Sequence, residues 1–517
     1  MRPFTKTNRA SVLYLALVFM ALLSMLALAY VRLVPLEMNS ALRYRESTKA
    51  HYVAEAGIID SLAYVQNELK NGNEPTPSGP VTRTGSLDGW NWETLISPDP
   101  QTPPLGDSAL RFYRLQSRAT KPGQSNAIWR IQCYVGEETF ARFTRYIDDF
   151  PTSNYYNIQT TPFIEGHVHI NDVIHIRTFP SLWTTTGDPA FKGFVTSASQ
   201  DPASPDGIDY FGPGGPPYPD DAKYARLYLG GRAGLNTGVS RIELPENSNA
   251  LARHAWGDTT AQPTAPGIHL NTDATGNLQG GVFIVGDVDE MVLGQDGSGN
   301  PTITVTQGGD VTTITEAVNA AAAGAPQGST AVVGATSAVF PGIPNGVYYV
   351  DGHINSFKGV NRNAHTIAVN LLANKEIIIT GNVTRADTPV NSRPQTPRDV
   401  LGIVAYRVRV SDTIPRDYAN PLQLYLSFVA GRKGDTNGGF IIDGWSNSAL
   451  GTGQFKVYGA WATARMAITG NWDMGGSHTS GYSYLQYFDP SLITSPPPHY
   501  PTTGKLPVVS WREDPGD

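Results

Sequence analysis

The chain contains one long apolar segment near its start, Ala10 to Val31, and this segment restricts the fold more than any other feature. It reads ASVLYLALVFMALLSMLALAYV and holds no charged residue over 22 positions. As an α-helix it would extend about 33 Å, enough to cross the hydrocarbon core of a bilayer. The sequence therefore predicts a transmembrane helix over 10–31.

The residues before this helix, 1–9, form a basic leader. They include Arg2, Lys6 and Arg9 and no acid. Because basic residues are retained on the cytoplasmic side, these three predict a cytoplasmic N-terminus. We therefore expect a single-pass protein of the bacterial inner membrane, with the bulk of the chain in the periplasm or outside the cell.

The alternative is a cleaved secretory signal, for which Ala27-Leu28-Ala29 would be a suitable site. However, apolar residues keep recurring at helical spacing beyond this site, as in Tyr52, Ala56 and Ile59. This pattern favours a retained helix with an amphipathic extension over 32–72, in which Pro35 predicts a kink or a short break.

Composition points to a mainly β protein beyond the helix. The 517 residues include 53 Gly and 39 Pro, and only 16% are charged, which is typical of a turn-rich β chain. The net charge of −7 argues against a nucleic-acid partner. Cys133 is the only cysteine, which excludes an intramolecular disulfide and a zinc site built from cysteines.

Composition and residue patterns divide the rest of the chain into four parts. We predict a Pro/Gly-rich linker over 73–108, a β meander over 109–150, a β-helix-like ectodomain over 151–489 and a Pro-rich tail over 490–517. Within 151–489 a residue-Gly-(Asp/Asn/His)-apolar element recurs at Gly166, Gly286, Gly352, Gly381 and Gly470. Glycine followed by a residue that tolerates left-handed backbone suits tight corners, so we expect an irregular right-handed parallel β-helix, with β-sandwich domains as the alternative.

The N-terminal region resembles that of PilX-type minor pilins. The resemblance rests on Asn8-Arg9-Ala10-Ser11-Val12-Leu13, the apolar run, and Tyr52-Val53-Ala54-Glu55-Ala56-Gly57 about 40 residues later. It implies processing between Ala10 and Ser11, although alanine stands where prepilins usually have glycine. Leu15 stands where major pilins carry glutamate, and this departure implies a position at the filament tip.

The ectodomain resembles large β-helical domains of an uncharacterised group of pilus-associated bacterial proteins. The matching segments are 166–171, 345–352, 401–405 and 487–492, followed by Pro496-Pro497-Pro498. This resemblance implies a role in assembly or surface contact and supplies no catalytic residues. The partners would be other pilin-like subunits, the pilus assembly machinery, the membrane, and a surface polysaccharide or cell-surface ligand.

Candidate metal ligands and catalytic groups are few. His167, His169 and His175 would share one face of a continuous strand and form the best metal candidates, but a His-x-His pattern is weak and we predict neither a metal nor another cofactor. The loops at Asp273 and Asp296 alternate oxygen ligands as calcium loops do, yet both fit turns better. Gly106-Asp107-Ser108-Ala109-Leu110 resembles the nucleophile block of GDSL hydrolases but lacks the strand–helix context.

Aromatic residues gather near the C-terminus, among them Trp445, Trp461, Trp472 and Tyr482, and we expect them to cap the end of the solenoid rather than bind a ligand.

Together, the apolar helix and the two resemblances favour a non-enzymatic pilin-like subunit. Two alternatives remain at this point: a membrane-tethered β-helical enzyme acting on carbohydrates, and a passive envelope scaffold.

Overall fold

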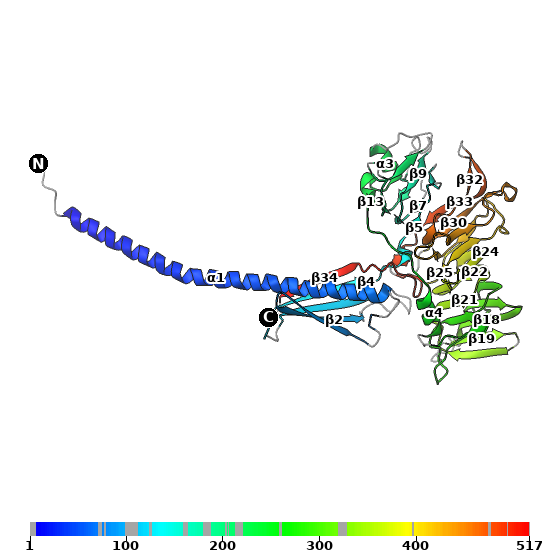
Figure 1. Cartoon of the computed structure of the whole chain (residues 1–517), viewed down its shortest axis with the longest axis horizontal. Helices are drawn as coiled ribbons and strands as arrows, with labels where there is room; N and C mark the ends of the chain where they lie inside the picture. Colours follow the sequence, from blue (N-terminus) through cyan, green and yellow to red (C-terminus); the bar gives the residue numbers. More distant parts are fainter. Residues whose placement is uncertain are drawn as a thin grey trace.

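The computed structural model describes three parts: a long helix, an antiparallel sheet packed on it, and a large β body (Figure 1). The described residues are 7–70, 75–76, 79–98, 112–123, 127–152, 154–158, 164–178, 188–201, 204, 206–211, 221–257, 261–318, 328–334, 336–394, 398–473, 477–493 and 495–515. The expectation of a mainly β chain that follows a long apolar N-terminal helix is confirmed.

The long helix, α1 (Thr7–Lys70), is continuous over 64 residues. The short break expected at Pro35 is absent: the helix passes through this residue and curves gently along its exposed half (Figure 1). Proline removes only one N–H from the helix, and the remaining hydrogen bonds of a helix this long maintain its course.

The second half of α1 packs on a five-stranded antiparallel sheet, which we call the head. Its strands, in spatial order, are β1 (Val81–Leu87), β2 (Trp90–Pro98), β3 (Phe112–Thr120), β4 (Trp129–Gly136) and β34 (Val508–Pro515). Two predictions were wrong here. The expected linker over 73–108 contains β1 and β2, and the expected tail over 490–517 contains β34.

The body is therefore inserted between two neighbouring strands of the head, β4 and β34. The chain leaves and returns through a two-stranded neck, in which Glu138 N donates to Lys505 O (3.1 Å) and Thr503 N donates to Glu138 O (2.7 Å). The last part of the expected meander over 109–150 also belongs elsewhere: η2 (Phe140–Arg142) turns the chain, and β5 (Arg145–Asp149) enters the body.

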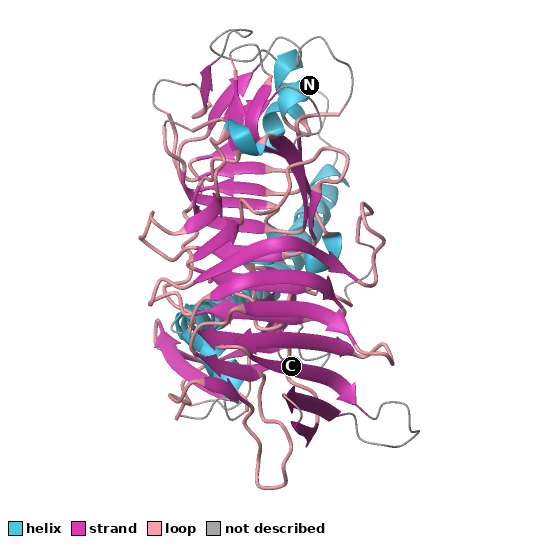
Figure 2. Ribbon diagram, turned by 90° about the vertical axis from the view of Figure 1, so that its right-hand side faces the viewer, coloured by secondary structure: helices cyan, strands magenta, loops and turns pink. Residues whose placement is uncertain are grey.

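The body consists mainly of two large sheets whose strands stack along its length (Figure 2). The 11-stranded sheet has the order β13 (Leu235–Thr237), β11 (Val195–Ser197), β8 (Val168–Ile170), β5, β31 (Trp461–Arg465), β28 (Ser427–Ala430), β25 (Leu401–Ala405), β23 (His365–Val369), β21 (Val347–Asp351), β15 (Val282–Val285) and β14 (Gly267–His269). Every pair in it is parallel except β14 with β15.

The second sheet has 15 strands, of which twelve form one continuous path. These are β10 (Phe191–Lys192), β7 (Ile164–Glu165), β33 (His478–Tyr487), β30 (Thr452–Tyr458), β27 (Leu422–Leu424), β24 (Glu376–Arg385), β22 (Ile354–Asn361), β16 (Glu290–Gln295), β17 (Pro301–Gln307), β18 (Asp310–Val318), β19 (Gly328–Val333) and β20 (Thr336–Pro341). Three more strands branch from it: β26 (Arg407–Val410), β29 (Gly439–Ile442) and β32 (Gly470–Trp472). The pairs from β16 to β20 are antiparallel and extend this sheet at one end.

The chain enters the stack at its middle. From β5 it moves outward through β8, β11 and β13, beside a small sheet of β6 (Tyr156–Ile158), β9 (His175–Thr178) and β12 (Asp209–Phe211) and the helix α3 (Asp221–Leu227). It then crosses to the far end through α4 (Asn249–Trp256), which packs on the outer face of the 11-stranded sheet. From β15 the strands return step by step until β31 pairs with β5. Strands more than 300 residues apart in sequence thus lie side by side at this junction, which we call the seam.

Two of the recurring Gly elements form stacked corners in the fold. Gly286 has φ +97°, and a Cβ on Gly352 would lie 2.1 Å from the carbonyl oxygen of Gly286. Only a residue without a side chain allows neighbouring corners to approach this closely.

We therefore predict that Gly352→Ala lowers the free energy of unfolding by about 1–3 kcal/mol, as overpacking against fixed backbone does. Gly297→Ala is the matched control, because a Cβ there meets no atom within 4 Å. Chemical denaturation of both variants checks the prediction, and equal midpoints would contradict it.

Candidate functional site: an uncovered apolar helix and the groove at its base

The first half of α1 exposes its apolar side chains all around the helix. Large hydrophobic residues from Val12 to Leu42 are 40–74% exposed, with Leu15 at 72%. The helix contains a window of 18 residues with a mean hydropathy of 2.6, none of it buried, and is long and apolar enough to cross a membrane. A helix of this kind is either a membrane anchor or a signal sequence.

The exposed apolar surface is longer than a bilayer is thick. From Val12 to Leu42 the helix rises about 46 Å, whereas the hydrocarbon core is about 30 Å thick. Leu33, Leu36 and Met38, each exposed by more than half, therefore extend the apolar surface beyond the predicted span 10–31. Such a surface is typical of a helix that packs against other protein segments.

The second half of α1 changes character at Ala50. Ala50, Val53, Ala54, Ile58 and Val65 are at most 1% exposed and form the stripe that packs on the head sheet. Small residues allow this close contact: a Cβ on Gly57 would lie 2.4 Å from Ser117 Oγ. The Ala-Glu-Ala-Gly element thus has a packing role, with Ala54 and Gly57 facing the sheet.

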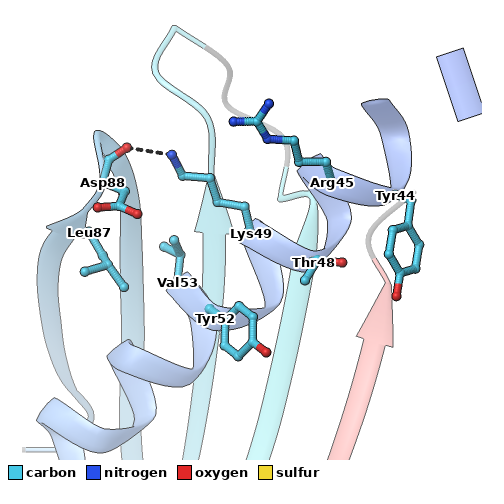
Figure 3. Close-up of a pocket in the computed structure, with 8 residues that line it drawn as sticks. All are labelled: Tyr44, Arg45, Thr48, Lys49, Tyr52, Val53, Leu87 and Asp88. Atoms are coloured by element: carbon cyan, nitrogen blue, oxygen red, sulfur yellow. Dashed lines mark hydrogen bonds between the residues drawn. The ribbon is translucent and has the colours of Figure 1, made fainter. Parts of the chain in front are cut away.

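A groove of about 400 Å³ lies where the helix reaches the head (Figure 3). It is lined by Tyr44, Arg45, Thr48, Lys49, Tyr52, Val53, Leu87 and Asp88. Val53 is buried, whereas Tyr44 and Tyr52 are 76% and 59% exposed. Lys49 Nζ donates to the backbone oxygen of Asp88 at 2.9 Å, which joins the helix to the β1–β2 turn. The groove continues the uncovered apolar surface and was not found from the sequence.

The residues of the predicted processing region are described only in part. Ala10 and Ser11 belong to α1, as does Arg9, whereas Arg2 and Lys6 lie outside the described residues. Leu15 points outward with the other apolar residues of the helix. The hydrolase-like block 106–110 also lies outside the described residues.

The three candidate histidines do not converge on one point. His169 is buried, with Nδ1 2.8 Å from Thr196 Oγ1 and Nε2 3.0 Å from Asn171 Oδ1. His175 belongs to a different sheet, where Nδ1 lies 2.8 Å from Asp209 Oδ2. His167 lies at a corner beside Phe194. In the part of the chain that the structure describes, no three His, Cys, Asp or Glu side chains are arranged to hold a metal.

Burial and local hydrogen bonds shift the pKa values of the candidate ligands His169 and Asp273. Burial lowers the pKa of His169 to about 4, despite its hydrogen bond with Asn171, so the ring is neutral at pH 7. Hydrogen bonds from Thr275 and Asn277 lower the pKa of Asp273 to about 2. Asp273 and Asp296 both accept hydrogen bonds from their own turns, as expected for turns.

The aromatic residues near the C-terminus lie in the middle of the body, not at its end. Trp461 is fully buried in the main core and contacts Phe428, Phe440 and Phe455. The expectation of a terminal cap was wrong because the returning chain brings its last coils to the seam. On the β32–β33 hairpin Trp472 stacks on His478, and the exposed Tyr418, from the loop before β27, contacts the same histidine edge-on.

No protein-family model, curated protein or solved structure matches the chain. Functional assignment therefore depends on the geometry of the chain itself.

Proposed function

We propose that the chain is a non-enzymatic, single-pass subunit of a type IV pilus or related filament, similar to PilX-type minor pilins. One observation carries the proposal. A single helix has an apolar, uncovered first half, and its second half packs on an antiparallel sheet. This design gives one element two uses, first in the membrane and then against the helices of neighbouring subunits.

The body supports a display role. Its strands alternate between two large sheets and pair in parallel with strands of the adjacent coil, which favours an irregular right-handed parallel β-helix over β-sandwich domains. Because it is inserted between β4 and β34, both of its connections pass through the neck. In this arrangement the head supports the body, which is available for assembly or for contact with a surface.

The orientation of the helix in the membrane follows from the basic residues at the N-terminus. Arg2, Lys6 and Arg9 hold the N-terminus in the cytoplasm, so the head and body are periplasmic or extracellular in a bacterial inner-membrane protein. Leu15 lacks the carboxylate that would neutralise a preceding subunit, which suits a subunit at the filament tip. The partners are then other pilin-like subunits and the assembly machinery.

The test is N-terminal sequencing of the native protein from strains with and without the prepilin peptidase. We expect the mature chain to begin at Ser11 only where the peptidase is present, and to occur in sheared filaments. Ala10→Leu should block processing because the site requires a small residue, whereas Ala16→Leu, the same change inside the helix, should not. An unprocessed terminus in both strains, or a freely soluble product that begins at Tyr30, would contradict the proposal.

A further inference from the structure

The seam places a charged side chain at a position that is otherwise apolar. In the register of the 11-stranded sheet, Arg145 of β5 stands between Trp461 of β31 and Val168 of β8. The other residues of this row are Val282, Tyr348, Ile367, Ile403, Phe428, Val195 and Leu235. A guanidinium thus occupies a core position at the seam, where the 11-stranded sheet joins the two halves of the body.

No carboxylate among the described residues compensates this charge. Arg145 is 1% exposed and makes no ion pair with any residue that the structure describes. Its Cζ lies 3.5 Å from the ring centre of Trp461 and 4.8 Å from that of Tyr484. Nε donates to Gln486 Oε1 at 2.9 Å, while the buried Nη2 makes no hydrogen bond.

The aromatic groups around the guanidinium supply no negative charge. The indole nitrogen of Trp461 is buried and has no acceptor in the part of the chain that the structure describes. The hydroxyls of Tyr156 and Tyr484 interact electrostatically with Arg145. Burial raises the pKa of both tyrosines, against the opposing effect of Arg145, so neither supplies a negative charge at pH 7.

Such an arrangement is unfavourable as it stands. An isolated ion in a protein interior costs several kcal/mol unless an opposite charge accompanies it. Aromatic rings offset part of this cost for Arg145, since desolvated cation–π contacts are favourable. A negative charge that accepts hydrogen bonds from Nη2 and from the indole would offset the remainder.

We propose that the seam binds a small monovalent anion the size of chloride, held by the guanidinium of Arg145 and the indole N–H of Trp461. Because Arg145, Trp461 and Tyr156 are all at most 1% exposed in a close-packed interior, a polyatomic anion such as phosphate or sulfate is too large. The anion joins the outgoing and the returning coils, whatever the role of the body.

The test is thermal unfolding of the full chain in detergent, with sodium chloride compared with sodium gluconate at equal ionic strength. Ligand binding to the folded state alone raises the melting temperature by mass action, and we expect a rise of about 3 °C at saturating chloride. Arg145→Met should abolish the dependence on chloride. Arg142→Met, at a nearby arginine that is partly exposed and paired with Glu138, should retain it.

A second measurement does not depend on the variants folding. Crystals of the wild-type protein grown in bromide should show an anomalous peak within hydrogen-bond distance of Arg145 Nη2 and Trp461 Nε1. Equal melting temperatures in the two salts, together with no bromide peak, would overturn the proposal and indicate that only water reaches these donors.

Discussion

Replacing Arg385 with methionine is expected to lower the free energy of unfolding of the body by about 3–5 kcal/mol, the usual result of removing one partner from a buried ion pair. Arg385 Nη1 donates to Asp489 Oδ2 at 2.7 Å, and Nη2 donates to Asp387 Oδ2 at 2.9 Å. The three side chains are 2–4% exposed. Without the guanidinium, two carboxylates would remain buried and uncompensated.

Lys358→Met is the control for this prediction. Lys358 Nζ lies 2.7 Å from Glu290 Oε1, also in the body, and the two side chains are 43% and 39% exposed. Because water screens exposed pairs, we expect a loss below about 1 kcal/mol. Denaturant titration of the full chain in detergent measures both variants, and a similar midpoint for the two would refute the prediction.

The carboxylates around Arg385 also bear on the alternative that the chain is a carbohydrate-active enzyme. Asp387, Asp399 and Asp489 are the kind of neighbouring carboxylates that glycoside hydrolysis uses. However, Arg385 fixes two of them, and Asp399 is fully buried and accepts a hydrogen bond from Asp387 N. Buried, ion-paired carboxylates do not reach a polysaccharide, so this cluster favours a structural role.

Local patterns predicted the helix and part of the head. The apolar run and the helical spacing after it describe α1, and alternation identified the strands that became β3 and β4. The β1–β2 hairpin was missed although Asp88-Gly89 is a strong turn signal; both residues have positive φ, as a type I′ turn requires. The many Pro, Gly, Ser and Thr residues of 73–108 concealed it.

Long-range pairing was beyond the reach of the sequence. β34 joins β4 across more than 370 residues, and no local pattern in Val508–Pro515 indicates that partner. The grouping of His167, His169 and His175 failed for a related reason. It assumed one straight strand, but the strand ends at Ile170, and the chain bends before His175 begins β9. Alternation predicts which residues share a face only while the strand continues.

Replacing Glu316 with glutamine is expected to lower the free energy of unfolding by about 3–5 kcal/mol at pH 7. Glu316 is 1% exposed on β18, and it joins the two sheets at the extended end of the body. Oε1 accepts a hydrogen bond from Tyr348 (2.7 Å) and lies 3.1 Å from His365 Nε2, while Oε2 accepts from Asn363 Nδ2 at 2.8 Å. A glutamine cannot accept from all three donors.

The charge state of the pair follows from its hydrogen bonds. Asn361 Nδ2 donates to carbonyl oxygens, so its Oδ1 faces His365 Nδ1 at 2.7 Å as an acceptor. Both ring nitrogens of His365 therefore donate, which requires the imidazolium form opposite the carboxylate. Removing the carboxylate charge leaves a buried cation without a counter-ion.

The dependence on pH provides the sharpest measurement. Burial raises the pKa of Glu316, but His365, Asn363 and Tyr348 outweigh it, so the net pKa lies below the ordinary value of 4.5. A lowered folded pKa means that the stabilisation is fully present above about pH 4.5 and is lost as the pH falls through the folded pKa. The difference in the free energy of unfolding between wild type and Glu316→Gln should therefore become smaller in acid.

The control is Glu290→Gln, at a partly exposed residue that pairs with Lys358 at 2.7 Å. It should lower the free energy of unfolding by less than about 1 kcal/mol. A wild-type protein no more stable than Glu316→Gln at pH 7 would show that the network contributes no net stabilisation.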